Sequence, residues 1–157
     1  MKKINTYILE KLHLNKELKQ EDHYNYHPKT NLELLDLVDK LISERRPNPD
    51  LNDIDVSEID IFDGIFNGLN CDGLDISKWD VSNAKSMECM FSWTERFDCD
   101  LSKWNVSNVE NMKGMFYHAS EFKGRGLEKW DVLTNCNMKD MFKYSPLEKN
   151  TPSWYHE

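Results

Sequence analysis

Two imidazoles and a stretch of carboxylates are the groups in this chain best suited to bind a metal ion. His23 and His27 are four residues apart, a spacing that would place both rings on one face of a helix. Pro28 follows at once, and no third ligand accompanies the pair. The carboxylates from Asp50 to Asp63 could bind Ca²⁺, but the glycine and terminal glutamate of a calcium-binding loop are misplaced. We therefore expect no metal or other cofactor, and we interpret the acidic stretch as a solvated cap.

The sequence also lacks the motifs of nucleophilic and phosphate-binding sites. Gly124 and Gly126 are not followed by the Lys-Ser/Thr pair that a phosphate-binding loop requires. The cysteines form no CxxC pair, and we interpret them as reduced, partly buried thiols. They are Cys71, Cys89, Cys99 and Cys136. With neither a nucleophile elbow nor a catalytic carboxylate pair in the sequence, we expect no enzymatic activity.

A repeat of about 25 residues fills most of the chain. The tryptophans that mark it are 25, 26 and 24 residues apart: Trp79, Trp104, Trp130 and Trp154. From Leu101 the unit reads LSKWNVSNVENMKGMF, and the copies on either side read ISKWDVSNAKSMECMF and LEKWDVLTNCNMKDMF. A period of this length is typical of units that stack and bury a shared core.

Two apolar spacings inside each unit predict its secondary structure. Trp104 and Val106 fit the pattern L-x-x-L-x-L, which is typical of a short strand with alternate side chains facing inward. Met112, Met115 and Phe116 follow at i, i+3 and i+4, the spacing of a short helix. The sequence therefore predicts an α/β fold, a short leucine-rich-repeat-like solenoid with one strand and one short helix per coil of ~25 residues. The tryptophans are expected to lie in its core.

The N-terminal third is expected to form a helical cap on the repeats. Helical spacing of apolar residues predicts one helix over residues 4–14 and another over residues 32–45. Thr30 and Glu33 form a capping box before the second helix. Its apolar face is expected at Leu32, Leu35, Val38, Leu41 and Ile42. The predicted organisation is a helical segment at 1–49, about four coils at 50–150, the first of them degenerate, and a C-terminal tail at 151–157.

The repeated core W-[DN]-V-S-N-V-x-x-M-x-x-M-F resembles the bacterial surface-protein repeat of mycoplasma lipoproteins and BspA-like leucine-rich-repeat proteins. The resemblance covers residues 51–150 and recurs in three copies. It implies a leucine-rich-repeat-like solenoid whose role is adhesion or protein binding. It implies no catalytic or cofactor-binding residue. The sequence shows no secretion signal, and we expect an intracellular protein.

The outward positions of the predicted strands form the candidate binding surface. They place three lysines in one file beside polar and acidic side chains. The candidate residues are Lys78, Asp80, Lys103, Asn105, Lys129 and Asp131. An ordinary solvated sheet face would have the same composition, so this alternative stays open.

Charge narrows the class of partner. The chain has 157 residues and a net charge of −8, and residues 50–157 hold eleven Lys/Arg against twenty Asp/Glu. A protein that binds phosphate backbones needs the opposite sign, so we expect no nucleic acid, and no apolar run is long enough to span a membrane. The sequence favours a non-catalytic module that binds another protein. The alternatives are a structural component of a virion or surface layer, or a small acidic intracellular inhibitor of a nucleic-acid enzyme.

Overall fold

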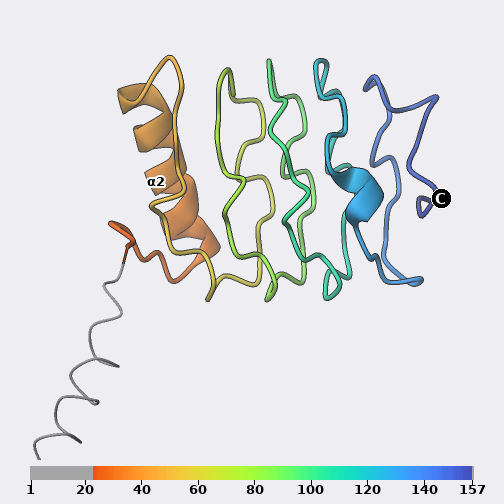
Figure 1. The fold of residues 1–157 in the computed structure, drawn as a ribbon, viewed down its shortest axis with the longest axis horizontal. Helices are drawn as coiled ribbons and strands as arrows, with labels where there is room; N and C mark the ends of the chain where they lie inside the picture. The colour runs from red at the N-terminus through yellow and green to blue at the C-terminus, as the bar shows by residue number, and fades with distance from the viewer. Residues whose placement is uncertain (1–22, 157) are drawn as a thin grey trace, which may run out of the picture.

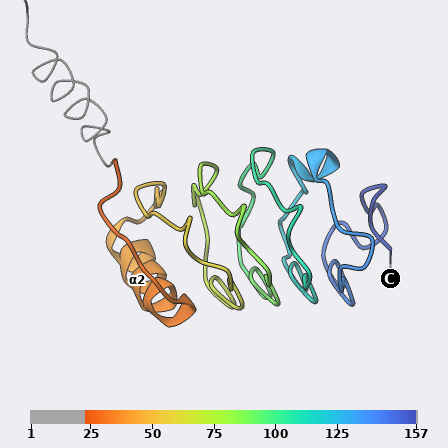
Figure 2. The same ribbon diagram turned by 90° about the horizontal axis from the view of Figure 1, so that it is seen from below.

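Stacked repeat units form the body of the protein, and a helix covers one end of the stack. The computed structural model describes residues 23–156. Helix α2 (Asn31–Glu44) lies at one end, and the units follow side by side to the C-terminal end (Figures 1 and 2). We number the units 1 (residues 51–73), 2 (74–100), 3 (101–126) and 4 (127–150). The predicted helix over residues 4–14 lies outside the described residues.

Helix α2 forms where the capping box predicts it. The Thr30 hydroxyl accepts a hydrogen bond from the Glu33 backbone N–H at 3.2 Å, and the Glu33 carboxylate accepts one from the Lys29 N–H at 2.7 Å. Both bonds satisfy free donors around the helix start. The buried face consists of Leu34, Val38, Leu41 and Ile42. Leu32 is 72% exposed, so the prediction of the apolar face was wrong at its first turn.

Asn31 joins α2 to unit 1 in the way that the units join one another. Between units, backbone N–H groups donate to carbonyls of the next unit, for example from Phe62 to Ser86 at 2.8 Å. The corresponding carbonyls of unit 1 belong to Ile61 and Asp63, and the Asn31 side-chain amide donates to them at 3.1 and 3.2 Å. The side chain thus replaces the donors of a missing preceding unit.

The predicted leucine-rich-repeat-like α/β solenoid, with a strand and a short helix per coil, was wrong. Between residues 23 and 156 the structure has one α-helix, one 3-10 helix, η1 (Leu127–Lys129), and no β-strand. The β-pairing between neighbouring units is limited to isolated parallel bridges, among them Ser86 with Asn111 and Asn111 with Asn137. The rest of each unit consists of turns and irregular backbone.

Residues with a left-handed backbone conformation explain why the i, i+3, i+4 pattern gives turns instead of a helix. In unit 3 the N–H of Met115 bonds to the carbonyl of Met112 at 3.1 Å, and the N–H of Tyr117 bonds to that of Gly114 at 3.0 Å. Gly114 itself has φ 58°, which a right-handed helix cannot accommodate. Its own N–H donates to Lys139 in unit 4 at 2.9 Å. The apolar residues still face inward, but from consecutive turns.

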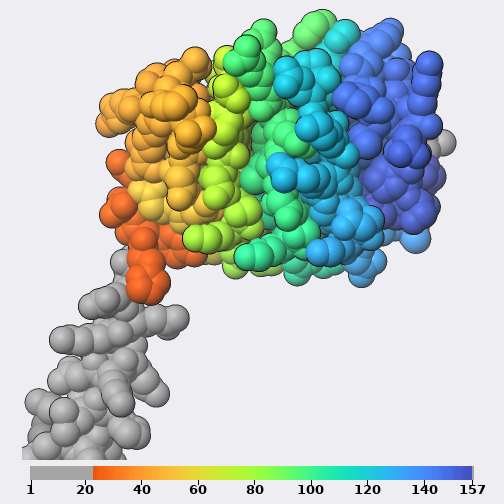
Figure 3. Space-filling model, turned by 45° about the horizontal axis from the view of Figure 1, so that its top comes forward, coloured from red at the N-terminus to blue at the C-terminus, as the bar shows by residue number. Residues whose placement is uncertain are grey.

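The file of repeated tryptophans lies largely in the core: Trp79, Trp104 and Trp130 are buried, as predicted, whereas Trp154 is only half-buried. Each indole N–H donates to a backbone carbonyl in the preceding unit, for example from Trp104 to Ile76 at 3.1 Å and from Trp130 to Leu101 at 3.1 Å. Beside it runs a file of parallel phenylalanines with ring centroids 5.2 to 5.7 Å apart. These are Phe66, Phe91, Phe116 and Phe142. In the space-filling view the units form successive bands across the molecule (Figure 3). Each unit therefore shares its core contacts with the units on either side of it.

Candidate functional site

The structure leaves the lysines of the predicted binding surface without ion pairs. Lys78, Lys103 and Lys129, which we call the lysine row, are exposed and contact no carboxylate of residues 23–156 within ion-pair distance. Most other basic side chains of the units bind an acidic side chain. They are Lys85, Arg96, Lys113, Lys123, Arg125 and Lys143. Lys139 and Lys149 also bind no carboxylate of the described residues, but the lysine row differs from them because its unpaired lysines recur at one position of successive units.

The polar residues beside the row stabilise turns. An Asp80 carboxylate oxygen accepts a hydrogen bond from the Ser82 N–H at 3.1 Å. The Asn105 side-chain oxygen accepts one from the Ser107 N–H at 3.2 Å and one from its hydroxyl at 2.7 Å. Unit 4 has leucine at the position of these serines, so Asp131 has no hydroxyl partner of the kind that Ser107 gives Asn105. Asp80 and Asn105 have structural roles whatever else they bind.

A shallow groove brings together four of the six predicted residues. It has a volume of about 290 Å³, and its lining includes Lys78, Asp80, Lys103 and Asn105. Lys129 and Asp131 do not line it. Unit 4 differs in this region because η1 ends at Lys129, after a connection with one extra residue. Lys78 and Lys103 of units 2 and 3 therefore share one groove, whereas Lys129 of unit 4 lies outside it.

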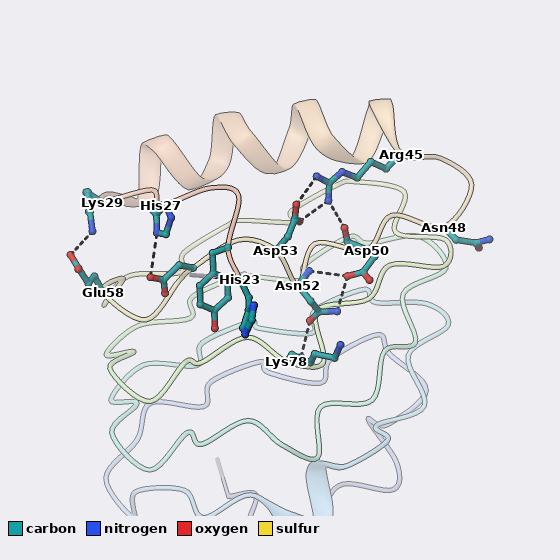
Figure 4. Close-up of a pocket in the computed structure, with 12 residues that line it drawn as sticks. His23, His27, Lys29, Arg45, Asn48, Asp50, Asn52, Asp53, Glu58 and Lys78 are labelled. Carbon is teal, nitrogen blue, oxygen red and sulfur yellow. Dashed lines mark hydrogen bonds and ion pairs between the residues drawn. The ribbon is translucent and has the colours of Figure 1, made fainter. Parts of the chain in front are cut away.

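A second, larger hollow lies where the segment before α2 crosses unit 1. Its volume is about 1250 Å³, and it is bordered by residues 23–29, the C-terminal end of α2 and the start of the repeats (Figure 4). The N–H of Asn25 donates to the carbonyl of Asp53 at 2.8 Å, and the N–H of Asp55 donates to that of Tyr26 at 2.9 Å. These bonds hold the segment against unit 1 and so form one wall of the hollow.

Ion pairs line this hollow. The Arg45 guanidinium binds both carboxylate oxygens of Asp53, at 2.7 and 3.0 Å. These hydrogen bonds hold the pKa of Asp53 below its ordinary value and raise that of Arg45. Lys29 binds Glu58 at 2.8 Å, also inside the lining. Most of the charge on this wall is therefore already neutralised by neighbouring side chains.

The two histidines that the sequence places at a metal-ligand spacing have separate surroundings. The His27 imidazole nitrogen lies 3.5 Å from the Asp55 carboxylate, and His27 is beside Lys29 on the wall of the hollow (Figure 4). Burial raises the pKa of Asp55, but the hydrogen bonds from Ser57 and His27 outweigh it and leave that pKa lowered. His23 lies between His27 and Lys78 in this view. Neither is in a helix, and no group of three or more His, Cys, Asp or Glu suited to a metal occurs among residues 23–156.

Most of the chain matches one known family. The family described as mycoplasma protein of unknown function, DUF285, matches residues 37–154. The chain belongs to this family. No curated protein and no solved structure matches it. The resemblance to mycoplasma sequences is thus confirmed, whereas its extension to BspA-like leucine-rich-repeat proteins is not. Within the part of the chain that the structure describes, no helix is long and apolar enough to cross a bilayer.

The residues matched by the DUF285 family include all of the smaller groove but only part of the larger hollow. The groove of the lysine row lies wholly inside the matched residues, whereas His23, His27 and Lys29 precede them. Lys78 lines both hollows and so joins them into one surface (Figure 4). Sequence patterns do not indicate the larger hollow, because it depends on the packing of residues 23–29 against unit 1. Tyr26, between the two histidines, was the available signal, since an aromatic residue within a polar loop often packs against the core.

Proposed function

We propose that this DUF285 protein is a non-catalytic module that binds another protein through the lysine row and the adjoining hollow. The observation that supports this most directly is the contrast between the row and the ion-paired surface around it. A carboxylate of a partner can bind Lys78 or Lys103 without displacing an internal carboxylate. At Lys85 or Lys113 it would have to compete with Glu110 or Glu88.

The shape of this surface supports a protein ligand. The groove beside Lys103 holds about 290 Å³ and the hollow beyond Lys78 about 1250 Å³, and both are open to solvent with charged side chains in their lining. Small-molecule sites are more often enclosed and apolar, with a few polar groups that fix orientation. A shallow, extended face with unpaired lysines is better suited to an acidic segment of a partner protein. Attraction between these opposite charges would speed association of the two proteins.

A charge-reversal experiment tests this proposal. The row variant carries Lys78→Glu, Lys103→Glu and Lys129→Glu. The control variant carries Lys40→Glu, Lys139→Glu and Lys149→Glu, at positions that are also exposed and unpaired among the described residues. Each exchange changes the charge by −2, so both variants go from the net −8 of the chain to −14. Nonspecific effects of charge are therefore equal in the two.

The measurement is capture of proteins from the native cell, quantified by mass spectrometry against the unmodified bait. An exposed ion pair contributes about 0.2–1 kcal/mol. Losing three of them is expected to weaken specific capture about tenfold or more in the row variant only. Equal capture by the row variant and the unmodified protein would refute the proposal, and so would equal losses in both variants.

The sequence leaves two further roles open, a structural component of an assembly and an inhibitor of a nucleic-acid enzyme. The more specific kinship with BspA-like surface proteins also stays a prediction, and the adhesion role it implies is itself a form of protein binding. Light scattering of the purified chain separates the assembly role from the others, because an assembly component should self-associate.

A further inference from the structure

Aromatic side chains, two of them exposed and two half-buried, form a strip along units 2 to 4, at a position distinct from the lysine row. It consists of Trp93, Tyr117, His118 and Tyr144 and is called here the aromatic strip. The Trp93 and His118 rings are stacked, with centroids 3.8 Å apart and planes 8° apart. His118 continues to Tyr144 at 4.5 Å, and Tyr117 contacts all three rings edge-on. Trp93 and Tyr144 are 55% and 53% exposed, although neighbouring residues of the same turns are buried.

The backbone at these positions favours glycine. Trp93, His118 and Tyr144 each follow the core phenylalanine of their unit by two residues, and their φ angles are 58°, 54° and 59°. Gly68 occupies this position in unit 1 with φ 72°. A bulky residue in the left-handed region is strained, and glycine would relieve the strain. Burial does not explain Trp93 or Tyr144 either, because both rings lie largely at the surface. Strained, exposed side chains of this kind occur preferentially at functional sites.

One face of the Trp93 indole is open. His118 stacks on one side of it, and the position in line on the other side is Gly68. A Cβ atom at Gly68 would meet no atom within 4 Å, so the space there is empty of protein. Among the described residues, no aromatic ring or cation stacks on that face. The strip thus ends, at unit 1, in an exposed aromatic surface that a planar group can cover.

Charge favours a cationic planar group. Residues 50–157 carry eleven Lys/Arg and twenty Asp/Glu, and Glu95, two residues after Trp93, is exposed and has no ion pair within the described residues. The nearest basic residue in sequence, Arg96, binds Asp72 at 3.3 Å. At the other end of the strip, the Lys143 ammonium lies 5.6 Å from the centre of the Tyr144 ring. The strip therefore already binds a cation at one end within the chain.

From these observations we infer that the open face of Trp93 binds an arginine side chain of a protein partner. The guanidinium is planar and cationic, and it stacks on indole faces more often than ammonium does. Trp and Arg are also the residues that contribute most often to binding hot spots. This inference does not depend on the lysine row, because it concerns a different position of each unit and the opposite charge on the partner.

The test uses a synthetic peptide, acetyl-Gly-Arg-Gly-Arg-Gly-Arg-Gly-amide, and its citrulline counterpart, which keeps the shape but carries no charge. Binding is followed by the indole N–H signals in a proton–nitrogen NMR spectrum. The other indoles, Trp79, Trp104, Trp130 and Trp154, donate to backbone carbonyls of the chain, and their signals serve as internal controls. The Trp93→Gly variant assigns the remaining signal.

We expect the arginine peptide to shift the Trp93 signal saturably, and the citrulline peptide to bind about three- to fivefold more weakly, as for an exposed cation–π contact. Trp93→Gly is expected to fold, as Gly68 does in unit 1, and to weaken arginine-peptide binding by the same factor. That variant keeps the net charge of −8, so general attraction of the peptide is unchanged. The variant with all three row lysines reversed should leave the Trp93 shift in place, because the two surfaces are independent.

Equal binding of the arginine and citrulline peptides to the unmodified protein would overturn the inference without any variant. Unchanged affinity of Trp93→Gly for the arginine peptide would do the same. A neutral oligosaccharide such as maltopentaose is the competing occupant, because sugar rings also stack on indole faces. Tighter binding of that sugar at the Trp93 signal would refute the arginine assignment.

Discussion

Replacing Trp104 by phenylalanine tests how the stack is held together. Trp104 is 4% exposed, and its indole N–H donates to the carbonyl of Ile76 in the preceding unit at 3.1 Å. Its ring also lies parallel to that of Trp130, with centroids 6.5 Å apart. Trp104→Phe removes the donor and part of the ring but keeps an aromatic group in the core.

Two contributions set the expected loss of stability. The carbonyl of Ile76 loses one of two donors, because the backbone N–H of Trp79 also donates to it at 3.1 Å, and this loss costs about 0.5–1.5 kcal/mol. The smaller ring leaves a cavity between units, which costs about 1 kcal/mol more. The sum, roughly 1.5–2.5 kcal/mol, is a substantial part of the 5–15 kcal/mol that stabilises an ordinary domain. At about 2–4 °C per kcal/mol, the Tm is expected to fall by roughly 3–10 °C.

Trp93→Phe is the matched control, since it makes the same exchange at an exposed indole that donates no hydrogen bond to the described residues. Its free energy of unfolding is expected to stay within about 0.5 kcal/mol of the unmodified protein. Both variants are measured by urea unfolding, with the remaining tryptophans as fluorescent probes. A Trp104→Phe variant as stable as Trp93→Phe would show that the indole hydrogen bonds do not hold the units together.

Three further predictions concern the turns, the loss of stability at acidic pH and the reactivity of a buried thiol. Gly114→Ala should lower the free energy of unfolding by about 1–3 kcal/mol in urea titrations, because φ is 58° there and the new Cβ would lie 3.2 Å from the Cys89 sulfur. The pKa of Asp53 is lowered by Arg45, so their pair stabilises the fold above the unfolded value of about 4 and is lost as the pH falls through the folded value. Asp53→Asn should therefore be less stable than the unmodified protein near about pH 7 but similar to it near about pH 2, when unfolding is measured across that range. Burial raises the pKa of Cys71 to about 12, so iodoacetamide near about pH 8 should alkylate it, by mass spectrometry, only as fast as the protein unfolds.

The repeat period and the inward positions could be predicted because they follow directly from side-chain type. Trp79 and Trp104 recur at equivalent positions, and both are buried. Even the degenerate unit 1 keeps Phe62 and Phe66 in the core, although it has no tryptophan at the repeated position. Apolar burial depends on spacing alone, so these assignments did not require the correct secondary structure.

Secondary structure was mispredicted because two different backbones satisfy the same spacing. Met112, Met115 and Phe116 face inward from a helix, but they also face inward from consecutive turns with a left-handed residue between them. Gly114 and its counterpart Gly64 in unit 1 were the signal, since glycine is unfavourable inside a helix and favourable at positive φ. In unit 2 this position is Cys89, which obscured the pattern.

The candidate site was only partly predictable, for a physical reason. The lysine row follows from the period, because Lys78 and Lys103 occupy the same position in successive units. The larger hollow does not, because it requires residues 23–29 to lie across unit 1, through bonds between residues far apart in sequence such as Asn25 and Asp53. Apart from Tyr26, whose aromatic ring in a polar segment indicates packing against the core, no local pattern encodes a contact of that kind.

The two proposed surfaces differ in how closely they follow the repeat. At the lysine row the same residue type recurs in units 2 to 4. Repetition of the unit sequence is therefore enough to explain why the lysines form a row. At the aromatic strip the backbone conformation recurs, with positive φ in every unit, but the residue changes from Gly68 to Trp93, His118 and Tyr144. If packing alone determined this position, the same residue type would be expected in every unit. If backbone strain alone determined it, glycine would be expected in every unit. Variation toward exposed aromatic residues in a strained conformation is explained by neither, and recognition of a ligand at the open end of the strip accounts for it.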